Sequence, residues 1–99
     1  MRDPEIMSQV KEILAKISKI EPGHAVELRI PPYSAIQCVE GPKHTRGTPP
    51  NVVEMSAEVL FDISSGVITW DDAISDGRIS ASGERSDLSA LFLQLVNAK

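Results

Sequence analysis

The sequence predicts an α+β fold, with a mostly antiparallel sheet of about four strands covered by helices on one face. Apolar residues recur every three or four positions near both ends of the chain, as in helices, whereas in the middle they alternate with polar residues, as in half-buried strands. A length of 99 residues without an internal repeat leaves room for one core. We therefore expect a single domain over residues 1–99.

The first element is predicted to be an amphipathic helix. Asp3 followed by Pro4 is a good helix start, and Pro22-Gly23 ends the segment. Between these limits a stripe of apolar residues has helical spacing: Ile6, Val10, Ile13, Leu14, Ile17 and Ile20. This face is expected to pack on the sheet.

Two strands are predicted to follow. Residues 26–30 alternate between apolar and charged side chains, which is typical of a strand with one wet face, and Pro31-Pro32 ends it. Residues 33–39 carry apolar or small side chains on both sides, so this strand is expected inside the sheet with both faces covered. A short third strand is predicted over residues 51–55.

Two helices are predicted next, each with a capping residue and a closing glycine. Ser56 and Thr69 can cap them, and Gly66 and Gly77 supply the left-handed residue that commonly ends a helix. This helix pair is long enough for a crossover, so one strand pair is expected to run parallel.

The chain is predicted to close with a strand and a helix. Residues 78–82 alternate as a strand, and Gly83 then turns the chain into a final helix from about Ser86. The apolar stripe of this helix is Leu88, Leu91, Phe92, Leu95 and Val96, and Leu93 widens it.

Composition excludes several classes of function. A net charge of −4 argues against nucleic-acid binding, because an acidic protein repels phosphates. No apolar run approaches the roughly 20 residues of a membrane span, and the N-terminus lacks a secretory segment, so we expect a soluble, cytoplasmic protein. Cys38 stands alone, which excludes an internal disulfide and a thiol-rich metal site, and no cofactor is predicted.

Most of the chain resembles a known family. The order and spacing of strand, helix, short helix and glycine-flanked strand over residues 51–83 resemble the C-terminal half of sterol carrier protein domains. Two further stretches resemble a short bacterial branch of these proteins: Pro31-Pro-Tyr-Ser-Ala-Ile-Gln-Cys-Val39 and His44-Thr-Arg-Gly-Thr-Pro-Pro-Asn-Val-Val-Glu54. The resemblance implies a sterol-carrier-like fold with a hydrophobic groove or tunnel between sheet and helices, which better-known relatives use for sterols, fatty acyl chains or phospholipids.

The leading functional hypothesis is therefore the non-catalytic binding of an apolar or amphipathic small molecule, of lipid or fatty-acyl type, in a small site between the sheet and the helices. The apolar candidates for this site are Leu60, Ile63, Trp70, Leu91 and Leu95. Each of them can equally pack in the core, as a domain of this size requires. The alternative hypothesis is a protein-interaction or accessory module without a small ligand, like domains attached to bacterial thiol-dependent isomerases, with a protein partner or a second copy as its occupant.

The polar candidates centre on residues 41–50, a loop with two cations and an imidazole in an otherwise acidic protein. Gln37, His44 and Arg46 are expected to hold the polar end of a ligand at the mouth of the site, and the cations of the loop favour a carboxylate or phosphate head group there. The alternative is a rigid loop in which the side chains of Arg46 and Thr45 bind the backbone of the loop or Glu54.

Catalysis is not expected. Cys38 and His44 are a weak thiol and base pair, because a mid-strand cysteine among apolar residues behaves as an inert hydrophobe. Asp71 and Asp72 are adjacent in a first helical turn, which favours interaction with the helix dipole over a catalytic carboxylate pair.

Overall fold

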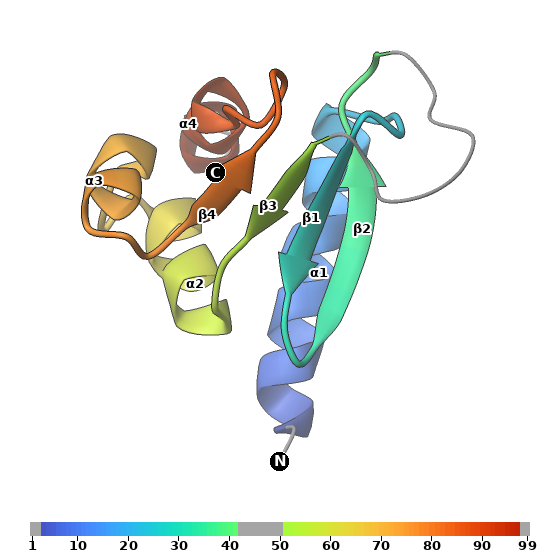
Figure 1. Cartoon of the computed structure of the whole chain (residues 1–99). Helices are drawn as coiled ribbons and strands as arrows, with labels where there is room; N and C mark the ends of the chain where they lie inside the picture. The colour runs from blue at the N-terminus through green and yellow to red at the C-terminus, as the bar shows by residue number, and fades with distance from the viewer. Residues whose placement is uncertain (1–2, 42–50, 98–99) are drawn as a thin grey trace.

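The computed structural model describes residues 3–41 and 51–97 and shows the expected α+β architecture in that part of the chain (Figure 1). The elements follow in the order α1 (Pro4–Ile20), β1 (Val26–Ile30), β2 (Ser34–Cys38), β3 (Val52–Glu54), α2 (Ala57–Ser65), α3 (Trp70–Ser75), β4 (Ser80–Ser82) and α4 (Ser89–Asn97). α1 crosses behind β1 and β2, whereas α2, α3 and α4 gather near β4 (Figure 1). The helices and the sheet enclose one core.

The sheet has the strand order β2-β1-β3-β4 and is mostly antiparallel. β1 pairs with β2 and β3 pairs with β4 in antiparallel fashion, while β1 and β3 run parallel. The expected parallel strand pair is confirmed, but the prediction that the helix pair connects its two strands is wrong. α2 and α3 join β3 to its antiparallel neighbour β4, because a connection long enough for a crossover can also return the chain to the same end of the sheet.

Strand β1 confirms the predicted wet and dry faces. Its side chains Val26, Leu28 and Ile30 are completely buried, whereas Glu27 and Arg29 are half-buried on the opposite face. There the Nε of Arg29 donates a hydrogen bond to Oε2 of Glu27 at 2.8 Å. The helices therefore cover one face of the sheet, and the other face remains polar.

The expected position of β2 inside the sheet is wrong, because β2 is an edge strand. Ala35 and Gln37 are exposed on the polar face, Ile36 is half-buried, and only Cys38 is fully buried. A small residue and an amide tolerate an open face as well as a covered one, so the pattern does not distinguish the two positions.

The predicted helix limits are confirmed wherever a side chain caps the helix. Asp3, Ser56 and Thr69 each accept a hydrogen bond from a backbone amide two or three residues downstream, at 2.9–3.2 Å. Gly66 ends α2 with φ of 83°, a conformation that favours glycine.

The final helix begins later than predicted, at Ser89 instead of about Ser86. The hydroxyl of Ser86 donates to the carbonyl of Gly83 at 2.8 Å, and the amide of Ser86 reaches the same oxygen at 3.3 Å. These bonds hold residues 83–86 in a turn. Serine is common both in turns and at helix N-termini. Because Ser86 takes part in a turn here, the helix starts later than predicted.

Asn51 organises the end of the sheet, a role that the sequence did not reveal. Its Nδ2 donates to the carbonyl of Ala25 at 2.8 Å, and its Oδ1 accepts from the amide of Arg85 at 2.9 Å. The side chain is 6% exposed and thus ties β1, β3 and the segment before α4 together from inside the protein.

Candidate functional site

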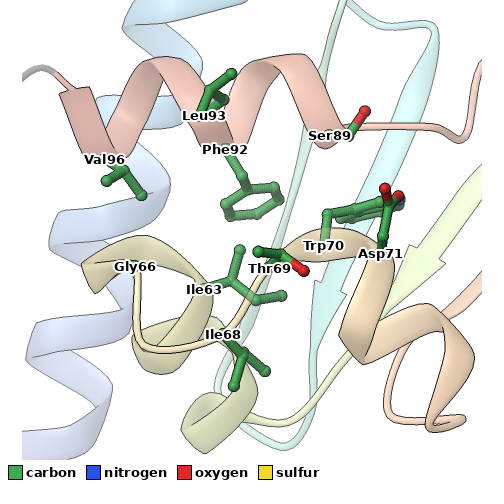
Figure 2. Close-up of a pocket in the computed structure, with 10 residues that line it drawn as sticks. All are labelled: Ile63, Gly66, Ile68, Thr69, Trp70, Asp71, Ser89, Phe92, Leu93 and Val96. Carbon is green, nitrogen blue, oxygen red and sulfur yellow. The ribbon is translucent and has the colours of Figure 1, made fainter.

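An apolar groove lies between the end of α2, the start of α3 and one side of α4 (Figure 2). Its volume is about 350 Å³. We call it the helical groove, and its lining consists of Ile63, Gly66, Ile68, Thr69, Trp70, Asp71, Ser89, Phe92, Leu93 and Val96. It has a more apolar lining than two other hollows in the described residues, one beside Leu91 and Arg85 and one beside His24 and Gly41. A concave, mostly apolar lining with a few polar groups is typical of small-molecule sites in proteins.

Two stacked aromatic rings form part of the groove wall. Trp70 and Phe92 have ring centroids 5.9 Å apart and planes inclined by 21°. Thr69 caps α3 and thereby places Trp70 at its first position, while Phe92 points from α4 toward Ile63 (Figure 2). Both rings are almost fully buried, so these residues belong at once to the core and to the groove. The two interpretations of Trp70 from the sequence, as a site residue and as a core residue, are therefore compatible.

Gly66 and Val96 close one end of the groove. A Cβ atom placed on Gly66 would approach Cγ1 of Val96 to 3.3 Å, so the glycine permits the α2 terminus to lie close to α4. Leu93, by contrast, is 63% exposed although it lines the groove. It forms an apolar rim that an occupant can cover.

The opposite end of the groove is polar. Asp71 and Ser89 lie there, away from Gly66 and Val96 (Figure 2). Asp71 is exposed and Ser89 half-buried, so both can meet solvent and the polar end of an occupant. The groove is consequently amphipathic along its length.

The five predicted apolar site residues occupy different places. Ile63 and Trp70 line the helical groove. Leu60 and Leu95 are buried in the core and line neither the helical groove nor the two other hollows. Leu91 lines a second hollow of about 180 Å³ together with Glu21, Val39 and Arg85. The side chains of α4 thus divide between core and groove according to their position around the helix.

The predicted polar site residues are not part of the groove lining as far as they are described. Gln37 lies on the polar face of the sheet, where its Oε1 is 2.8 Å from Nδ1 of His24. His44 and Arg46 lie outside the described residues. Gly41 and Asn51, which flank that segment, do not line the helical groove.

Sequence reasoning missed several groove residues, among them Ile68, Asp71 and Ser89. The available signal was Leu93, which widens the apolar arc of α4 beyond what a core-facing stripe needs. Ser89 and Asp71 gave no signal of their own, because first-turn polar residues are common in helices.

The structure offers no activated nucleophile at Cys38. The side chain is completely buried, and burial raises the pKa of its thiol to about 11. The thiolate is therefore scarce at neutral pH, as the inert interpretation of this residue requires. Within residues 3–41 and 51–97, no three His, Cys, Asp or Glu side chains gather as metal ligands, and no helix is both long and apolar enough to span a membrane.

Comparisons with solved structures show the same fold in sterol carrier proteins. "UbiJ-SCP2 Ubiquinone synthesis protein" aligns with a TM-score of 0.56 and 12% identity, covering 99% of this chain and 95% of that one. The crystal structure of Sterol Carrier Protein 2 Like 2 from Aedes aegypti aligns with a TM-score of 0.52 and 17% identity, covering 95% and 99% of the two chains. The solution structure of palmitated SCP2L2 from Aedes aegypti gives 0.53 and 19% identity, with 95% of each chain covered.

The search of curated proteins finds no significant match. A family model, in contrast, matches residues 2–93, which is nearly the whole chain, and its description is "Bacterial SCP ortholog". Fold and sequence therefore agree with the resemblance noted above, and the chain belongs to the bacterial sterol carrier protein (SCP) orthologs.

Proposed function

We propose that the protein is a non-catalytic carrier that binds the apolar part of a lipid-type small molecule in the helical groove. The observation that carries the proposal is the groove itself, an amphipathic hollow with an aromatic wall and an exposed apolar rim at Leu93. Its volume of about 350 Å³ lies within the range of small-molecule sites in proteins.

The proposed site differs in position from the site expected from the sequence. Between sheet and helices, side chains such as Leu28 and Leu60 are completely buried and pack in the core. The groove instead lies among α2, α3 and α4, so an occupant would not displace core residues. Ile63 and Trp70 remain in the proposed site, and Phe92 and Leu93 join them.

Family membership supports this proposal. A relative with the same fold is named as palmitated, which supports the apolar chain of an acyl group, irrespective of its head group, as a suitable occupant of such a domain. The alternative, an accessory module without a small ligand, is not favoured because it leaves the amphipathic groove without a role. We also propose that the protein is located in the cytoplasm, as expected from the sequence.

The first prediction concerns the groove rim. Leu93→Asp is expected to weaken the binding of the uncharged dye Nile red about tenfold, because covering the exposed part of a leucine contributes on the order of 1.4 kcal/mol. The measurement is a fluorescence titration, followed by displacement of the dye with 1-dodecanol. The variant should fold normally, since Leu93 is 63% exposed.

Val67→Asp is the matched control for this prediction. Val67 is an apolar residue with 71% exposure that does not line the groove. Its variant should bind the dye within about twofold of the unmodified protein, as is usual for surface changes away from a site. Absence of dye binding, or equal weakening in both variants, would contradict the proposed function.

A further inference from the structure

The polar end of the groove carries a negative charge. Among the described lining residues, Asp71 is the only one with a charged side chain. The neighbouring hydroxyls belong to Ser89 and Thr69, and neither supplies a positive charge. A ligand whose apolar part fills the groove would therefore place its head group beside a carboxylate.

Helix N-termini at the same end could in principle attract an anionic head group instead, since their free amides carry partial positive charge. The structure shows that protein oxygens already occupy amides there. Oδ1 of Asp87 accepts from the amide of Ser89 at the start of α4, at 2.9 Å, and this bond lowers the pKa of Asp87. Oγ1 of Thr69 accepts from the amide of Asp72 in α3, at 3.1 Å. Asp87 lines the second hollow and not the helical groove, but its carboxylate lies at the start of α4, so an anion gains little from the N-terminus of that helix.

From this arrangement we propose that Asp71 is a specificity-determining residue of the groove, which selects lipid-type ligands whose polar end donates a hydrogen bond and carries no negative charge. Hydroxyl and ammonium head groups meet this condition, whereas a carboxylate is repelled. The inference rests on the proposed function, because it needs an apolar chain in the groove. It adds the chemical class of the head group.

The test compares three ligands of equal chain length as competitors of Nile red: 1-dodecanol, dodecylammonium and dodecanoate, each below its micelle concentration. Because Asp71 is exposed, its effect on one charged ligand is expected to be about fivefold or less in low salt. Asp71→Asn should shift the affinity ratio of dodecylammonium to dodecanoate about five- to tenfold in favour of dodecanoate, because both ions respond. The affinity for 1-dodecanol should stay within about twofold, since asparagine still offers an acceptor.

Asp72→Asn is the control, because Asp72 is another exposed aspartate in the same helical turn and does not line the groove. Its ratio should change by no more than about twofold, as expected for a more distant screened charge. Equal shifts in the two variants, or an unchanged ratio in Asp71→Asn while all three ligands still bind, would overturn the inference and leave the carrier function standing. Failure of all three ligands to displace the dye would overturn the carrier function as well.

Discussion

Replacing Trp70 by alanine is expected to lower the free energy of unfolding by about 3 to 5 kcal/mol, the usual cost of removing a buried aromatic side chain. Trp70 is 7% exposed and stacks on Phe92 with 5.9 Å between the ring centroids. Alanine removes this contact and leaves a void between α3 and α4. Urea denaturation followed by circular dichroism measures the loss, since Trp70 is the single tryptophan and its fluorescence disappears in the variant.

Trp70→Phe provides the comparison for this prediction. Phenylalanine retains an apolar ring that can stack on Phe92, so the expected loss is smaller, about 1 to 2 kcal/mol. If Trp70→Ala instead lowered the free energy of unfolding by less than about 1 kcal/mol, the ring would not be part of the core and would not form a rigid wall of the groove.

Asn51→Ala is expected to cost about 2 to 4 kcal/mol of stability, although the side chain is small. It removes one hydrogen bond to the carbonyl of the buried Ala25 and one from the part-buried amide of Arg85. An unsatisfied buried group costs about 1 to 3 kcal/mol, and loss of the second bond adds about 0.5 to 1.5 kcal/mol. The loss should appear in a denaturant titration as a lower midpoint with an unchanged slope.

Ser64→Ala is the control for buried polarity. Ser64 is 8% exposed, and its Oγ has no hydrogen-bond partner within the part of the chain that the structure describes. Its removal should therefore leave stability unchanged or raise it by up to about 1 kcal/mol. If Ser64→Ala proved as costly as Asn51→Ala, hydrogen bonding would not explain the role of Asn51.

Local signals in the sequence predict much of the fold. Capping and apolar spacing depend on neighbouring residues only, which is why the limits set by Asp3, Ser56, Thr69 and Gly66 are confirmed. The order of strands depends on contacts between distant segments. The edge position of β2 and the parallel pairing of β1 with β3 were therefore not predictable from alternation alone.

The site was less predictable than the fold. Apolar spacing shows that one side of α4 is buried but not which residues pack in the core and which line a hollow. Leu95, which packs in the core, and Phe92, which lines the groove, illustrate this division. The polar end of the groove depends on Asp71 and Ser89, which are 18 positions apart in the printed sequence and meet only through the packing of α3 and α4. No pattern of neighbouring residues in the sequence predicts that these two side chains lie at the same end of the groove.

Methyl NMR during titration with 1-dodecanol is the most direct measurement of where a ligand binds. The expected result is that chemical-shift changes concentrate on the methyl groups that line the groove, those of Ile63, Ile68, Leu93 and Val96. The methyl groups of Leu28 in the sheet should show no change in chemical shift. Shifts confined to the methyl groups of α1 and the sheet, or no shifts at concentrations that displace the dye, would show that the helical groove does not hold the apolar chain.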